Sequence, residues 1–102
     1  MSINIGRHSF EGPYSDTDYL QNRSGIYAIL DDQSSTTYVV DIGESADVKS
    51  RVESHDRKDC WQRNHRGTLK IAVLYTPNLQ QSGRMAIEQE LRDKFQPVCG
   101  VR

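Results

Sequence analysis

The sequence has few of the features that mark a secreted, membrane-bound or zinc-thiolate protein. Only two of its 102 residues are cysteines, Cys60 and Cys99, and they form no short pairing motif. Two thiols are too few for a zinc site built on cysteines, so we expect both to be reduced and without chemistry. No apolar run approaches the roughly 20 residues that span a bilayer, and residues 1–7 lack the basic and hydrophobic segments of a secretion signal. These absences favour a cytoplasmic protein with no membrane partner.

A strong excess of charge is also missing. The net charge is −1, which argues against a dedicated nucleic-acid-binding domain, because such domains are usually strongly basic. Hydrophobic residues make up 35% of the chain and charged residues 26%, as in ordinary globular proteins. We therefore expect one domain over residues 1–102, with its core between about residues 10 and 100.

Charge is nevertheless distributed unevenly along the chain. Residues 49–70 hold seven lysines and arginines against three acidic residues. Aromatic rings lie between these cations, so the segment could meet a phosphate backbone and stack on a base. The same pattern is also typical of a solvated helix and loop surface. The candidate nucleic-acid-binding residues are Lys49, Arg57, Lys58, Trp61, Arg63, His65 and Arg66.

Strand-forming residues predict a small sheet. Residues 25–30 and 36–42 are rich in β-branched and aromatic side chains and enclose a polar loop, which predicts a hairpin. Residues 68–75 predict a third strand in the middle of the sheet. Residues 1–24 carry turn formers and predict an irregular lead-in with one short helix near residues 16–22. The expected fold is α/β (α+β), a small three-stranded antiparallel sheet flanked by helices.

The first expected helix carries polar side chains on the face that should be apolar. It covers residues 45–55 and has Ser45 as its N-cap. Arg51 and His55 fall on the same face as two valines, because residues three and four apart stack on one side of a helix. A guanidinium and an imidazole are therefore expected to point inward.

The second expected helix adds a carboxylate. It begins near Ser82 and stops before Pro97, which cannot continue a helix interior. Glu88 lies on the edge of the apolar stripe, beside Leu91 and Phe95. Burying such groups costs several kcal/mol unless they are paired or bind something, which suggests a site. A structural pair between Glu88 and the inward arginine, with a half-buried histidine, is the alternative.

In the order of its motifs the chain resembles the GIY-YIG nuclease superfamily. Gly25-Ile26-Tyr27 matches the first tripeptide, and Asp41-Ile42-Gly43 lies where the second is expected. Arg51, His55 and Glu88 follow in the order of that superfamily. The resemblance implies a metal-dependent endonuclease that hydrolyses phosphodiester bonds in nucleic acid, with DNA as the expected substrate.

The resemblance also implies a role for each residue of the site. Glu88 would hold one divalent cation, Mg²⁺ or Mn²⁺, and Tyr27 would position or deprotonate the attacking water. Arg51 would neutralise charge on the scissile phosphate, and His55 would assist proton movement or orient its neighbours. Without the whole pattern, Tyr27 would be read as an ordinary strand aromatic that packs on the sheet.

The chain departs from the superfamily at two positions. Asp41 stands where the second tripeptide begins with tyrosine, and Gly100 stands where an asparagine usually follows the proline. An ionised aspartate only accepts hydrogen bonds and cannot copy a phenol. Asp41 could therefore be a second metal ligand beside Glu88, the general base, or the mark of a site without turnover.

Two other functions stay open at this stage. A module that keeps the fold without catalysis would bind nucleic acid or a protein partner, and a third interpretation is a protein-interaction domain that binds no nucleic acid. Members of the superfamily usually carry an added domain that selects the substrate. In this chain the basic segment, a protein partner or a homodimer would have to supply that selection.

Overall fold

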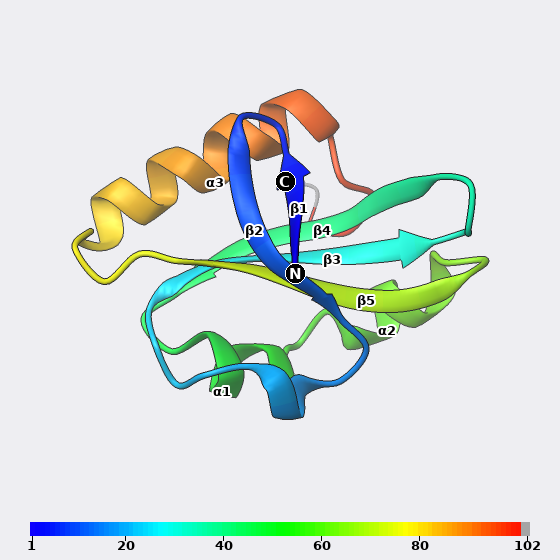
Figure 1. Cartoon of the computed structure of the whole chain (residues 1–102), viewed down its shortest axis with the longest axis horizontal. Coiled ribbons are helices and arrows are strands. Elements are labelled where there is room, and N and C mark those ends of the chain that lie inside the picture. Colours follow the sequence, from blue (N-terminus) through cyan, green and yellow to red (C-terminus); the bar gives the residue numbers. More distant parts are fainter. Residues whose placement is uncertain (101–102) are drawn as a thin grey trace.

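The computed structural model describes residues 1–100 and folds them around one antiparallel sheet (Figure 1). Its five strands are β1 (Ser2–Ile5), β2 (His8–Tyr14), β3 (Gly25–Asp32), β4 (Thr37–Ser45) and β5 (Thr68–Tyr75). The helices of this part of the chain are the 3-10 helix η1 (Thr17–Tyr19), α1 (Val48–Glu53), α2 (Lys58–Arg63) and α3 (Gln81–Phe95). The strands lie in the order β1-β2-β5-β3-β4. No helix in residues 1–100 is both long and apolar enough to cross a bilayer.

The α+β class is confirmed, but the prediction of a three-stranded sheet is wrong. The lead-in supplies two further strands, which pair with each other and extend the sheet beyond β5. Gly6, at a φ of 62°, makes the turn between them, and the buried side chains of Ile5 and Phe10 anchor them to the core. These two apolar residues are separated by polar ones, so the segment resembled a loop. The short helix expected near residues 16–22 is η1.

The predicted hairpin, third strand and last helix are present, with shifted ends. β4 continues to Ser45, so the predicted N-cap belongs to a strand. Asp47 caps α1 instead, because its side chain accepts a hydrogen bond from the backbone N–H of Ser50. β5 lies in the middle of the sheet, as predicted, because the lead-in strands cover its outer edge.

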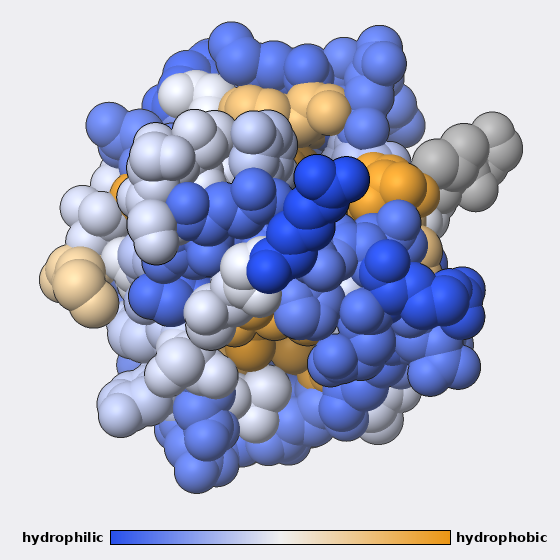
Figure 2. Space-filling model, turned by 90° about the vertical axis from the view of Figure 1, so that its right-hand side faces the viewer, coloured by the Kyte–Doolittle hydropathy of each residue, from blue (hydrophilic) through white to orange (hydrophobic). Residues whose placement is uncertain are grey.

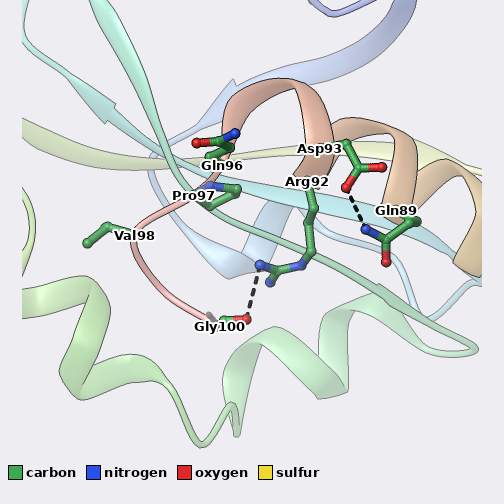
Figure 3. Close-up of a pocket in the computed structure, with 7 residues that line it drawn as sticks. All are labelled: Gln89, Arg92, Asp93, Gln96, Pro97, Val98 and Gly100. Atoms are coloured by element: carbon green, nitrogen blue, oxygen red, sulfur yellow. Dashed lines mark hydrogen bonds between the residues drawn. The ribbon is translucent and has the colours of Figure 1, made fainter. Parts of the chain in front are cut away.

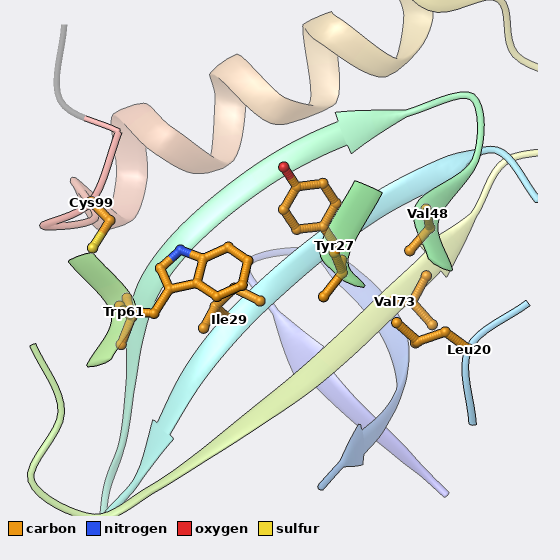
Figure 4. Packing of buried hydrophobic residues seen from close by; sticks show 9 residues of the cluster. Leu20, Tyr27, Ile29, Val48, Trp61, Val73 and Cys99 are labelled. Carbon is orange, nitrogen blue, oxygen red and sulfur yellow. The ribbon is translucent and has the colours of Figure 1, made fainter. Parts of the chain in front are cut away.

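Helices cover both faces of the sheet, with α3 above it and α1 and α2 below in the view of Figure 1. Each face has its own buried cluster, because successive strand residues point to opposite sides. The cluster beneath the sheet includes Tyr27, Ile29, Val48, Trp61 and Val73 (Figure 4). The cluster under α3 includes Phe10, Ile26, Ala28, Ile42 and Leu91. β4 is an edge strand, so side chains from both helical layers can reach it.

The expectation of reduced cysteines is wrong, because Cys60 and Cys99 form a disulfide. The bond joins α2 to the segment after α3, and the backbone N–H of Cys99 donates to the Val40 carbonyl of β4. The two cysteines are 39 residues apart and become neighbours only when both helical layers fold against β4. Disulfides are typical of oxidising surroundings and rare in the cytosol, so this bond does not favour the expected cytoplasmic location.

We expect reduction of this disulfide to lower the free energy of unfolding by about 2 to 4 kcal/mol, because it frees a long loop in the unfolded chain. Urea unfolding with and without dithiothreitol measures the change. The Cys99→Ser variant should have the lower stability under both conditions and should not respond to the reductant. A native protein with the same urea midpoint in both conditions would contradict this expectation.

Candidate functional site

Tyr27 of β3 lies across a glycine of the neighbouring strand. Its cross-strand partner on β4 is Gly43, where a Cβ atom would come within 2.1 Å of the phenol oxygen. Only a residue without a side chain leaves room for the ring in this position. The ring is buried, and its hydroxyl points across β4 in the direction of α3 (Figure 4).

His55, which follows α1, is hydrogen-bonded to this hydroxyl. Its Nε2 lies 2.7 Å from the Tyr27 oxygen, and its Nδ1 accepts the backbone N–H of Arg57 at 3.0 Å. A ring whose Nδ1 accepts carries its proton on Nε2 when neutral, so we assign His55 as the donor to Tyr27. The hydroxyl hydrogen of Tyr27 is then left to point elsewhere.

Burial and neighbouring arginines keep His55 neutral. Burial lowers the pKa of His55 to about 4, and the guanidiniums of Arg51 and Arg57 lower it further than the nearby carboxylates raise it. Asp56 approaches the ring at 3.3 Å, but a neutral imidazole forms no ion pair with it. At neutral pH His55 is therefore a fixed hydrogen-bond donor.

Tyr27 is a neutral phenol in the same environment. Burial raises the pKa of Tyr27 to about 12, and the Asp41 carboxylate adds to the rise. The guanidinium of Arg51 opposes it, both by its charge and by a hydrogen bond to the phenol. A divalent cation bound near the same oxygen would add a second positive charge, which would lower the pKa of Tyr27 as Arg51 does.

Arg51 of α1 lies on the solvent side of the Tyr27–His55 pair. Its Nη2 donates to Asp56 Oδ1 at 3.2 Å, and its side chain is 40% exposed. The prediction that both polar residues of the expected helix over residues 45–55 point inward therefore holds fully for His55, which follows α1, and only in part for Arg51. The guanidinium is exposed enough to meet an anion that approaches from solvent, although Asp56 already accepts one of its N–H groups.

The position of Glu88 follows from its neighbours one helical turn away on either side. Arg84 Nε donates to Glu44 Oε2 at 2.9 Å, and Arg92 Nη2 donates to Asp41 Oδ1 at 2.5 Å. Both carboxylates belong to β4, so the face of α3 that holds these three residues lies along this strand.

Glu88 thus faces the part of β4 that lies between Asp41 and Glu44. This part includes Gly43, across which the Tyr27 hydroxyl points. Glu88 itself is half-buried. The structure therefore brings Tyr27, His55 and Arg51 together and sets the helix face of Glu88 along the same strand edge.

Asp41 has contacts that conflict with the roles of metal ligand and general base. It is fully buried, and its Oδ2 accepts from Arg57 Nε and from Trp61 Nε1, both at 2.8 Å. Its Oδ1 accepts from Arg92 Nη2 at 2.5 Å and from the backbone N–H of Ile42 at 2.8 Å. A base or a metal ligand needs an oxygen that can reach substrate or cation. Asp41 instead holds two arginines and a tryptophan in place.

This arrangement could not be predicted from the sequence, because its members come from separate segments. A register shift in the pairing of β3 and β4 at Ile29 and Leu30 marks a bulge next to Asp41, and a bulge re-aims the side chains beside it. The carboxylate turns to the strand edge, where α2, α3 and the C-terminal segment meet.

Gly100 lies against the two arginine side chains that bind Asp41. Its carbonyl accepts from Arg92 Nη1 at 3.3 Å (Figure 3). A Cβ atom at Gly100 would lie 2.5 Å from Arg92 Nη2 and 3.1 Å from Arg57 Cζ, and its φ of 78° also favours glycine. An asparagine at this position, as in the GIY-YIG superfamily, would therefore have to displace the two arginine side chains that Asp41 binds.

The predicted nucleic-acid-binding residues do not form one surface. Trp61 is 5% exposed and its ring lies 4.7 Å from that of His55, so it cannot stack on a base. Arg57 is half-buried against Asp41. Both lysines of the set contact Glu53. Lys49 Nζ lies 4.0 Å from the Glu53 carboxylate, and Lys58 Nζ donates to the backbone carbonyl of Glu53.

Three residues of the set remain at the surface near the end of α2. Arg63 and Arg66 are exposed, and their guanidiniums have no hydrogen-bond or ion-pair partner among residues 1–100. His65 Nδ1 lies 2.8 Å from the Gly67 carbonyl. This group lies at the opposite end of β4 from Gly43, beside the β3–β4 hairpin.

A cation at this site would have to be held by a single carboxylate. In the described part of the chain no group of three or more His, Cys, Asp or Glu side chains could hold a metal ion. Mg²⁺ commonly takes one or two carboxylates and fills its shell with water and phosphate oxygens. Glu88 would be its protein ligand.

In comparisons with protein-family models, with curated proteins and with solved structures, no match to this chain was found. Its function is therefore inferred from its own residues and their geometry.

The buried neutral His55 predicts a loss of stability in acid. The unfolded chain binds a proton at His55 near pH 6.5, whereas the folded protein resists it until about pH 4. The unfolded state therefore binds more protons between these values, and stability falls as the pH falls through this window, by about 2 to 4 kcal/mol. NMR titration of the His55 ring, with urea unfolding at each pH, checks both parts. A ring that titrates near pH 6.5 would contradict the prediction.

Proposed function

We propose that this chain is a metal-dependent nuclease that hydrolyses phosphodiester bonds in nucleic acid, with DNA as the first substrate to test. The observation that carries the proposal is the 2.7 Å hydrogen bond between Tyr27 and His55, which lies beneath Arg51. This pair is at the edge of β4, and the face of α3 that holds Glu88 lies along the same strand. Nothing in ordinary packing requires a phenol, an imidazole and a guanidinium to meet at the edge of a sheet.

Each residue would act through its observed surroundings. The hydroxyl of Tyr27 accepts hydrogen bonds from His55 and from Arg51, so its own hydrogen can orient the attacking water. Arg51 would stabilise the negative charge that grows on the phosphate. A divalent cation held by Glu88 would supply Lewis-acid chemistry and favour hydroxide over water.

His55 would act as a positioning residue. Its Nε2–H fixes the phenol oxygen, and its low pKa of about 4 keeps it from becoming a cation at neutral pH. Tyr27 has a pKa of about 12, so in the resting protein it would bind water as a neutral phenol. The proton of the attacking water therefore needs an acceptor outside this pair, or a phenol whose pKa is lowered by a cation bound nearby.

Asp41 favours a second candidate function, a module that binds nucleic acid or a protein partner without cleaving. Its buried ion pairs leave no catalytic group at the position where GIY-YIG nucleases have a tyrosine. Both candidates need substrate selection, for which the surface cations, a protein partner or a second copy of the chain are the proposed sources.

A plasmid-nicking assay with Mg²⁺ or Mn²⁺ separates the two candidates. The native protein should nick supercoiled DNA, and Glu88→Gln should abolish nicking while leaving DNA binding in place. Glu90→Gln is the matched control, because Glu90 lies on the same helix but bonds Arg7 and His8 instead. Binding to DNA without cleavage under any divalent cation would favour the module.

A further inference from the structure

A pocket lies at the hairpin end of the molecule, away from Tyr27. It has a volume of about 530 Å³ and lies between β4, the loop after α2 and the segment after α3. Its lining includes Tyr38, Arg63, His65 and Arg66. The volume is within the range of small-molecule sites. Figure 2 shows that the face at this end is mainly hydrophilic, with small apolar areas between the polar ones.

The cations of this pocket are available to an anion. The guanidiniums of Arg63 and Arg66 have no partner among residues 1–100, unlike Arg57 and Arg92 in the Asp41 cluster. Two unpaired guanidiniums at the mouth of one pocket suit a phosphate, because the planar fork binds two of its oxygens at once.

The one acidic residue in the lining already accepts three hydrogen bonds. Asp31 accepts the backbone N–H groups of Arg66 and Gly67 at 3.0 and 2.8 Å and the side chain of Gln33 at 2.7 Å. Burial alone would raise the pKa of Asp31, but these hydrogen bonds lower it. Asp31 thus fixes the loop that presents Arg66 and leaves the free cations to face the ligand.

Tyr38 supplies an aromatic surface beside these cations. It is paired with Asp31 across the hairpin and is 53% exposed. An exposed ring next to a phosphate site can receive one base, provided that the base is not already stacked in a duplex.

The pocket and the Tyr27 site share one strand. Tyr38 and Gly43 are both on β4, and their partners on β3, Asp31 and Tyr27, are four residues apart, which corresponds to about 13 Å along the sheet. At the rise of one B-form strand this distance is about four nucleotides. One nucleic-acid strand that follows β4 could therefore contact both.

We propose that this pocket binds one unpaired nucleotide, with its phosphate on Arg63 and Arg66 and its base against Tyr38. The inference rests on the proposed function for its choice of a nucleic-acid strand over a free nucleotide. A pocket that accepts an unpaired base would favour a single strand as substrate, or a duplex with a single-stranded end or bulge.

Binding without metal tests the pocket separately from cleavage. In EDTA, the native protein is titrated into a labelled 12-nucleotide single strand, into its duplex, and with deoxythymidine monophosphate as a free nucleotide. We expect the single strand to bind most tightly. Tyr38→Ala should weaken it by about 5- to 100-fold, and the Arg63→Gln/Arg66→Gln double variant should lower the slope of log K against log salt by about 0.7, the value for one phosphate contact. Lys94→Gln, which removes an exposed cation of α3, is the control.

The outcomes separate this proposal from the nuclease proposal. Unchanged single-strand affinity in both Tyr38→Ala and the double arginine variant overturns the pocket, whether or not the native protein cleaves DNA. Binding of the monophosphate without binding of the strand overturns the link to nucleic acid. Strand binding that depends on these residues, in a protein that nicks nothing, leaves the pocket standing and removes the nuclease.

Discussion

Replacing Tyr27 by phenylalanine is expected to lower nucleic-acid cleavage by about 10²- to 10⁴-fold, the usual effect of losing a group that orients or transfers a proton. The ring would still fill its place between β3 and the lower core. The lost hydroxyl accepts a hydrogen bond from His55, and Arg51 lowers its pKa. Initial rates of plasmid nicking at fixed Mn²⁺ measure the change.

Two further variants provide a matched control and a second way to displace the hydroxyl, and urea unfolding of each shows whether it is folded. Tyr14→Phe removes a phenol that stacks on Tyr19 away from the site and should leave the rate unchanged. Gly43→Ala keeps the hydroxyl but places a methyl group within 2.1 Å of it, so the phenol must move and the rate should fall as in Tyr27→Phe. A Tyr27→Phe protein that cleaves at the native rate would remove Tyr27 from the mechanism.

Replacing Asp41 by asparagine is expected to lower the free energy of unfolding by about 3 to 5 kcal/mol, because one partner of a buried ionic cluster is lost. The amide would leave Arg57 and Arg92 without a counter-charge, and its NH₂ group would point at cations that also only donate. Urea unfolding measures the loss. Glu90→Gln, in an exposed pair with Arg7, should change stability little.

The same variant tests the role that the sequence suggested for Asp41, that of a second metal ligand. If Asp41 only positions the arginines, the folded fraction of Asp41→Asn should bind Mn²⁺ as the native protein does. An Asp41→Asn protein with native stability and weakened Mn²⁺ binding would contradict the structural role and return Asp41 to the metal site.

What could be predicted from the sequence depended on local patterns. The hairpin, the strand at residues 68–75 and the helix before Pro97 follow from alternation, from 3.6-residue periodicity and from proline. The inward position of His55 followed from its place beside Val52 in the helix pattern, and the structure buries both side chains.

What could not be predicted depends on contacts between distant segments. The Asp41 cluster takes donors from residues 16, 20 and 51 positions away, and the disulfide spans 39. Trp61 resembled a base-stacking residue because the sequence does not show that its indole N–H bonds a buried carboxylate. Tyr38 in the hairpin pocket had no signal beyond being an aromatic residue next to a loop.

The central claim is that Glu88, Tyr27 and His55 border one cation site. Mn²⁺ broadens the NMR signals of nearby nuclei, so a titration of the native protein locates the cation without requiring turnover. We predict that the ring signals of His55 and Tyr27 broaden first, and that Glu88→Gln abolishes this effect whereas Glu90→Gln does not. Broadening centred on other residues, or identical broadening in Glu88→Gln, would contradict the account.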